Sequence, residues 1–93
     1  VLHLDLTPVE QIDWRAGDAV VMVDSQPKTG RHTLADGVPI RAVLDHHETP
    51  GELTGVPFVD VRPHLGATCT LVTRYLTDQE TPIPEKVATA LLY

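Results

Sequence analysis

Three consecutive residues, Asp45, His46 and His47, are the strongest sign of chemistry in the sequence. They close an apolar run at 40–45, and an earlier apolar run ends in the same manner at Asp24. Carboxylate oxygens and imidazole nitrogens are common ligands of divalent metal ions. If the two runs form neighbouring parallel strands, their ends lie about 5 Å apart. Asp24 and His46 can then share one divalent ion.

Strand geometry predicts different roles for Asp45 and His46 at the end of the second run. Side chains of an extended chain point alternately to opposite faces, so Asp45 and His46 point apart unless the strand bends. We expect one of them to bind the ion and the other to support the site. Taken alone, Asp24 is also a common turn residue at a strand end. The pair His46 and His47 could equally be solvated loop residues, but the combined pattern favours ligands.

Three segments have the composition of strands. The runs at 19–24 and 40–45 are continuously apolar and rich in β-branched residues, which is typical of parallel strands covered on both faces. A shorter run at 56–61 has Pro57 near its start and predicts a short or edge strand. Residues 1–6 are a further strand candidate.

Two segments have the pattern of helices. Residues 67–76 predict an amphipathic helix with one apolar face, formed by Leu71, Val72, Tyr75 and Leu76. Pro84 is well placed as the first residue of a second helix. Its expected buried stripe consists of Val87, Ala88, Leu91 and Leu92. Together these elements predict an α/β fold, with a largely parallel sheet and flanking helices.

The composition of the chain excludes several classes of protein. The chain has 93 residues, with 13 acidic against 7 basic side chains and a formal charge of −6. This acidic balance argues against an extended nucleic-acid surface. The single cysteine excludes an internal disulfide framework and a cysteine-rich zinc site. No apolar run is long enough to span a bilayer, so we expect a cytoplasmic protein without a membrane partner.

The motifs, in this order, resemble those of the DHH phosphoesterase superfamily, and within it the RecJ-like or nanoRNase-like branch. Residues 21–27 look like the second motif of that family, and residues 43–47 look like its name-giving third motif. Residues 66–71 and 87–93 match the approach to the fourth. The resemblance implies a metal-dependent phosphoesterase that hydrolyses short oligoribonucleotides or small nucleotide phosphates, such as 3′-phosphoadenosine 5′-phosphate.

The resemblance also implies roles for single residues. Asp24 would bridge two metal ions, and His46 would ligate one of them. His47 would face the substrate phosphate, and Asp45 would orient or support the cluster. Asp45 and His47 are therefore the predicted catalytic residues. The ions would be manganese, with magnesium as a substitute.

Other residues are candidates for contact with a substrate phosphate. Arg62 has a guanidinium group that matches phosphate geometry, and His64 lies close to it in sequence. Thr68 either holds a phosphate at a helix N-terminus or simply caps that helix. The long connection at 25–39 contributes three weaker candidates, Lys28, Arg31 and His32.

Several expected parts of such an enzyme are absent from residues 1–93. The first motif of the family should precede Val1, and the aspartate of the fourth should follow Tyr93. The substrate-binding second domain is also missing. We therefore expect a partial DHH domain whose full-length protein is an enzyme, with a homodimer as an option, and whose isolated segment is inactive.

Alternative functions remain open at this stage. The full-length protein could be a non-catalytic nucleotide-binding or regulatory module, or it could act on pyrophosphate, polyphosphate or a cyclic dinucleotide. A small zinc-stabilised domain that uses His64 and Cys69 is a weaker option, because their spacing is irregular. Cys69 is better explained as a small buried residue of its helix. Trp14 and Tyr75 are expected to pack rather than to stack on bases.

Overall fold

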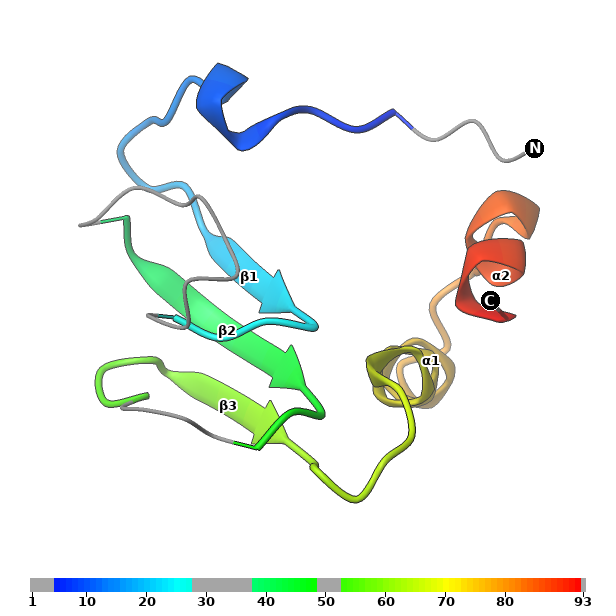
Figure 1. The fold of residues 1–93 in the computed structure, drawn as a ribbon. Coiled ribbons are helices and arrows are strands. Elements are labelled where there is room, and N and C mark those ends of the chain that lie inside the picture. The colour runs from blue at the N-terminus through cyan, green and yellow to red at the C-terminus, as the bar shows by residue number, and fades with distance from the viewer. Residues whose placement is uncertain (1–4, 28–37, 49–52, 93) are drawn as a thin grey trace.

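The computed structural model describes residues 5–27, 38–48 and 53–92. Its elements, in chain order, are a 3₁₀ turn at Val9–Gln11, β1 (Val20–Val23), β2 (Ile40–Asp45), β3 (Phe58–Val61), α1 (Thr68–Asp78) and α2 (Glu85–Leu92) (Figure 1). All three main strand predictions and both helix predictions are confirmed, with ends that differ by at most two residues. Pro84 precedes α2 instead of opening it, and its carbonyl accepts the hydrogen bond of Ala88 N–H.

The strands form a parallel sheet in the order β1-β2-β3. Val23 lies opposite Leu44, and Asp45 lies opposite Val61. The carboxyl ends of all three strands therefore meet at one edge of the sheet, on the side where α1 lies (Figure 1). This arrangement confirms the predicted α/β fold with a parallel sheet, and it confirms β3 as an edge strand.

Helix α1 packs against β2. Leu71 is 1% exposed and joins Met22 and Val43 as the buried apolar residues of the described chain. Tyr75 also lies on this face, where its ring meets Phe58 edge-on, with the ring centres 5.9 Å apart. The predicted apolar face of α1 is thus confirmed, and Tyr75 packs as expected.

The expectation that both apolar strands are covered on both faces is wrong for β1. Val21 and Val23 are 55% and 47% exposed, whereas Met22 between them is buried. These two valines are exposed because β1 lies at the sheet edge, whereas α1 packs over β2.

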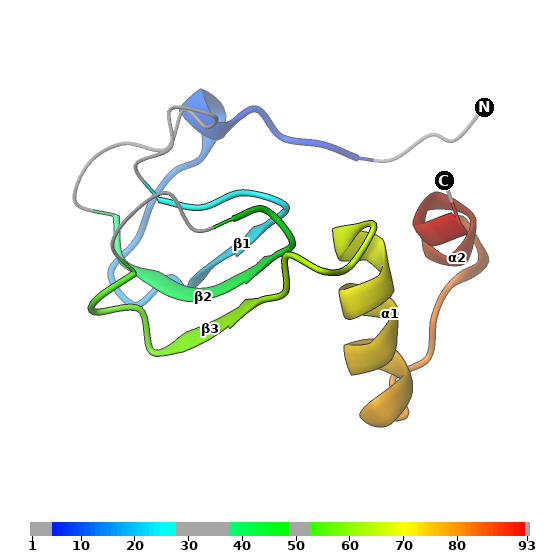
Figure 2. The same cartoon turned by 60° about the horizontal axis from the view of Figure 1, so that its bottom comes forward.

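The buried stripe expected on α2 is also wrong. None of its residues is buried, and Leu92 is 89% exposed. Helix α2 packs against α1 and lies away from the sheet (Figure 2), so α1 is its main neighbour within the described chain.

Three smaller expectations have different outcomes. Of the strand candidate at 1–6, residues 1–4 lie outside the described residues, while Asp5 and Leu6 belong to no strand. Cys69 is half-buried instead of buried. No helix in the described ranges has the length and apolar character needed to cross a membrane.

Candidate metal centre

Asp24 occupies a sharp turn directly after β1. Its φ of 60° lies in the left-handed region, which aspartate tolerates better than most residues do. Its backbone N–H donates to the carbonyl of Leu44 at 2.9 Å, so the turn stays attached to β2. The side chain is 63% exposed and projects beyond the edge of the sheet. The turn role and a ligand role are therefore compatible in the same residue.

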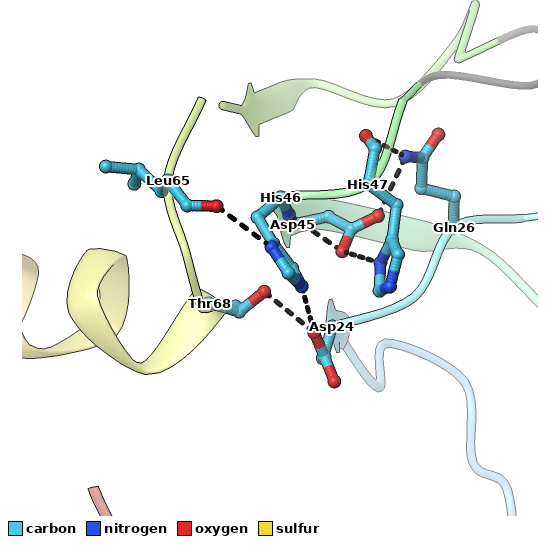
Figure 3. A network of polar contacts seen from close by, with 7 residues as sticks. All are labelled: Asp24, Gln26, Asp45, His46, His47, Leu65 and Thr68. Carbon is cyan, nitrogen blue, oxygen red and sulfur yellow. Dashed lines mark hydrogen bonds and ion pairs between the residues drawn. The ribbon is translucent and has the colours of Figure 1, made fainter. Parts of the chain in front are cut away.

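His46 follows β2 directly and faces Asp24 (Figure 3). Its Nε2 lies 3.4 Å from Asp24 Oδ1, and its Nδ1 lies 3.1 Å from the carbonyl oxygen of Leu65. A carbonyl oxygen only accepts, so Nδ1 carries the ring proton in this contact. In the neutral ring, Nε2 then presents a lone pair to the carboxylate. A cation between these two atoms satisfies both, and a backbone carbonyl on the far nitrogen is the usual support of a metal-binding histidine.

His47 lies beside His46, with the ring centres 4.4 Å apart (Figure 3). Its Nδ1 is 2.7 Å from Asp45 Oδ1, which leaves Nε2 as the nitrogen available to a ligand. One ligand atom each from Asp24, His46 and His47 lies within 4.8 Å of the others. We call these three residues the ligand cluster.

Asp45 is the buried support of this cluster. It is 1% exposed and accepts hydrogen bonds from Gln26 Nε2 at 2.7 Å, from His46 N–H at 2.8 Å and from His47 Nδ1. Burial disfavours its charge, but these hydrogen bonds outweigh burial and hold the pKa of Asp45 below its ordinary value. The carboxylate is therefore ionised and held by these three hydrogen bonds. Asp45 positions His47, and the structure does not bring it to the surface where a substrate would lie.

Gln26 is a member of the site for which the sequence predicted no role. It is 2% exposed, and besides Asp45 its Nε2 also lies 3.3 Å from the carbonyl oxygen of His47. In the sequence it lies two residues after the strand-end acid and directly before Pro27, within the segment 21–27 that resembles the second motif.

Thr68 contacts the cluster as a hydrogen-bond donor. It is 4% exposed, and its Oγ1 donates to Asp24 Oδ1 at 2.9 Å. Thr68 is the first residue of α1, and Ala67 occupies the N-cap position without a side-chain cap hydrogen bond. The capping role considered for Thr68 is therefore wrong. Its hydroxyl binds Asp24, and contact of the α1 N-terminus at Thr68 with a phosphate stays a prediction.

Arg62 is not brought to the ligand cluster. Its Nε and Nη2 donate to the two carboxylate oxygens of Asp60, at 2.8 and 3.0 Å. Asp60 also accepts a short hydrogen bond from Tyr75. We call Asp60, Arg62 and Tyr75 the Asp60 cluster. The guanidinium group predicted to bind phosphate is thus engaged in joining β3 to α1.

A pocket of about 290 Å³ opens beside Asp24 and His46. Its lining joins the end of β1, the start of α1 and α2, and comprises Val23, Asp24, His46, Ala67, Thr68, Cys69, Val72 and Leu91. His64 is exposed, and neither it nor Cys69 belongs to the ligand cluster of the described chain, which offers no support for the zinc option. Lys28, Arg31 and His32 lie outside the described residues.

Comparisons with known proteins assign no family. No family model matches the chain, and no solved structure matches it. An uncharacterized protein of Methanocaldococcus jannaschii is 31% identical over 93 residues, which are all of this chain and 19% of the relative. The chain thus spans about a fifth of the length of the relative that it matches.

Proposed function

We propose that this chain supplies part of the two-metal centre of a DHH-type phosphoesterase of the RecJ-like or nanoRNase-like branch. The proposed substrates are short oligoribonucleotides or small nucleotide phosphates. One observation carries the proposal: Asp24 Oδ1 and His46 Nε2 converge to 3.4 Å at the carboxyl ends of neighbouring parallel strands. Ligands of open α/β sheets bind at this edge.

The donor set suits manganese, with magnesium as a substitute. Asp24 offers carboxylate oxygens, and His46 and His47 offer imidazole nitrogens. This mixture of oxygen and nitrogen donors without thiolate is the kind that Mn²⁺ accepts. When bound, a pair of such ions lowers the pKa of water and neutralises charge on the phosphoryl oxygens. Asp24 is the residue proposed to contact both ions.

His47 is proposed to face the substrate phosphate. The ionised Asp45 accepts a hydrogen bond from its Nδ1, so Nε2 is the nitrogen that faces outward. A protonated Nε2 donates to a phosphate oxygen, whereas a neutral one accepts a metal ion. Asp45 thus acts through His47 in either state.

The test measures manganese affinity and hydrolysis by the full-length protein, with a dinucleotide, 3′-phosphoadenosine 5′-phosphate and inorganic pyrophosphate as substrates. His46→Ala is expected to abolish hydrolysis and to weaken manganese binding by more than about 100-fold, since loss of a supporting residue alone costs up to that much. His64→Ala is the matched control, because it removes an exposed imidazole outside the cluster.

Two results would count against the proposal. Near-normal turnover by His46→Ala would exclude the ligand role of this histidine. Binding of nucleotide by the wild-type protein with manganese but without turnover would instead favour a regulatory module.

A further inference from the structure

We infer that Thr68 is a positioning residue, which orients the Asp24 carboxylate so that each of its oxygens is available to a cation. The inference rests on the proposed metal centre. It assigns a role in metal binding to the start of α1, which contributes no residue to the ligand cluster.

The hydroxyl of Thr68 points toward Asp24. A threonine at a helix start ordinarily bonds to the free N–H groups of the first turn. Here Ala67 is the N-cap residue, and its carbonyl accepts from Thr70 N–H at 3.2 Å. The hydroxyl of Thr68 turns instead to a residue 44 positions earlier in the chain. Burial of a hydroxyl is unfavourable unless it is hydrogen-bonded, so the bond to Asp24 satisfies a group that is 4% exposed.

Thr68 donates to Oδ1, the same Asp24 oxygen that lies 3.4 Å from His46 Nε2. A carboxylate oxygen has two acceptor sites. With one of them occupied by Thr68, Oδ1 retains one for a cation shared with His46. Figure 3 shows the other oxygen on the far side of the carboxylate, pointing away from Thr68.

Without this bond, little else would fix the orientation of the Asp24 side chain. Its side chain is 63% exposed and starts from a turn, so packing restrains it little. Thr68, in contrast, is held in the first turn of α1 next to the buried core residue Leu71. The rigid partner therefore orients the mobile one, and a bridging carboxylate requires a defined orientation.

The experiment compares Mn²⁺ binding by wild-type full-length protein and by Thr68→Val, measured by calorimetry. Valine keeps the shape of the side chain and removes the hydroxyl. We expect 10- to 100-fold weaker Mn²⁺ binding, the usual effect of losing a residue that supports a metal ligand. Thr68→Ser should restore affinity to within a few-fold of wild type. Thr70→Val, an exposed threonine in the same turn, is the matched control and should change nothing.

A double-mutant cycle separates this role from a general effect on folding. In an Asp24→Ala background, Thr68→Val should cause no further loss of Mn²⁺ affinity. Wild-type affinity in Thr68→Val, or an equal loss in both backgrounds, would overturn the inference while leaving the proposed function intact. A wild-type protein that binds no Mn²⁺ would overturn both.

Discussion

The two histidines of the ligand cluster are each held by the nitrogen that faces away from the proposed ion. Nδ1 of His46 contacts a backbone carbonyl, and Nδ1 of His47 contacts Asp45. Each contact fixes which nitrogen carries the proton and which way the ring faces. Hydrogen bonds to groups outside the ligand cluster therefore hold both rings in place. For His47 these groups are Asp45, which it contacts directly, and Gln26, which hydrogen-bonds to Asp45.

Replacement of Asp45 by Asn tests this dependence. The new amide nitrogen is a donor. It replaces either Oδ2, the acceptor of Gln26 Nε2, or Oδ1, the acceptor of His46 N–H and His47 Nδ1. We expect the free energy of unfolding to fall by about 2 kcal/mol, because the group left unpaired is buried. Manganese affinity should fall by about 10- to 100-fold. Urea denaturation and calorimetry measure the two effects.

A surface aspartate serves as the control for this change. Asp13 is 87% exposed and lies in a loose ion pair, so Asp13→Asn should leave both quantities unchanged. If Asp45→Asn behaved in the same way as Asp13→Asn, the supporting role of Asp45 would be wrong.

At the level of elements, the Asp60 cluster joins β3 to α1 through the largely buried carboxylate of Asp60. The hydrogen bond from Arg62 lowers the pKa of Asp60, burial opposes this, and the hydrogen bond from Tyr75 adds to the lowering. The phenol shows the reciprocal effect, because its hydrogen bond to Asp60 raises the pKa of Tyr75. The position of α1, and with it the position of Thr68, depends in part on this charge.

The pH dependence of stability follows from the direction of the Asp60 shift. A carboxylate whose pKa is lower in the folded state stabilises the fold above its unfolded pKa of about 3.9. That contribution is lost as the pH falls from about 4 through the lower, folded value. We expect Asp60→Asn to be less stable than wild type at pH 7 and to lose less stability on acidification. Urea denaturation between pH 7 and pH 2 measures both effects.

The exposed residue Asp78 provides the matched variant for the acid titration. Asp78→Asn should keep the wild-type pH profile. If Asp60→Asn also kept it, the Asp60 cluster would contribute nothing to the attachment of α1.

In the described chain as a whole, the buried residues include those that support the ligand cluster. The described chain buries three apolar side chains, Met22, Val43 and Leu71, and three polar ones. All three buried polar residues, Gln26, Asp45 and Thr68, hydrogen-bond to the ligand cluster or to its support. Binding of a cation to the cluster therefore acts directly on the stability of the fold.

Metal addition and removal test this coupling. Saturation with Mn²⁺ at about 100 times its dissociation constant should raise the free energy of unfolding by about 2.7 kcal/mol, and a chelator should reverse the gain. Thermal unfolding with and without Mn²⁺ is the measurement. Identical curves would show that the cluster does not bind the ion in the folded state.

Activity of the 93-residue segment should remain low even with manganese. The three ligand atoms of the cluster suffice for one ion, and a second ion needs further donors. We expect little or no phosphate release from the three substrates named above. Turnover comparable with that of the full-length protein would contradict a two-metal centre that is only partly encoded here.

Local sequence patterns were enough to predict the helices, the strands and the proximity of two site residues. Apolar runs and turn residues act locally, so strands and helices were predictable within two residues of their observed ends. The proximity of Asp24 and His46 followed from a general rule, because parallel neighbouring strands end at the same edge. No side-chain detail was needed for either conclusion.

The groups that hold the site in place could not be predicted in this way, because they depend on long-range packing. Gln26 reaches Asp45, Thr68 reaches Asp24, and Arg62 turns to Asp60, through contacts that depend on how α1 sits on the sheet. Several partners were available to each of these polar side chains. For the buried Gln26 and Thr68, burial decides the partner, because a polar group removed from water must bond to a partner that the packing places within about 3 Å.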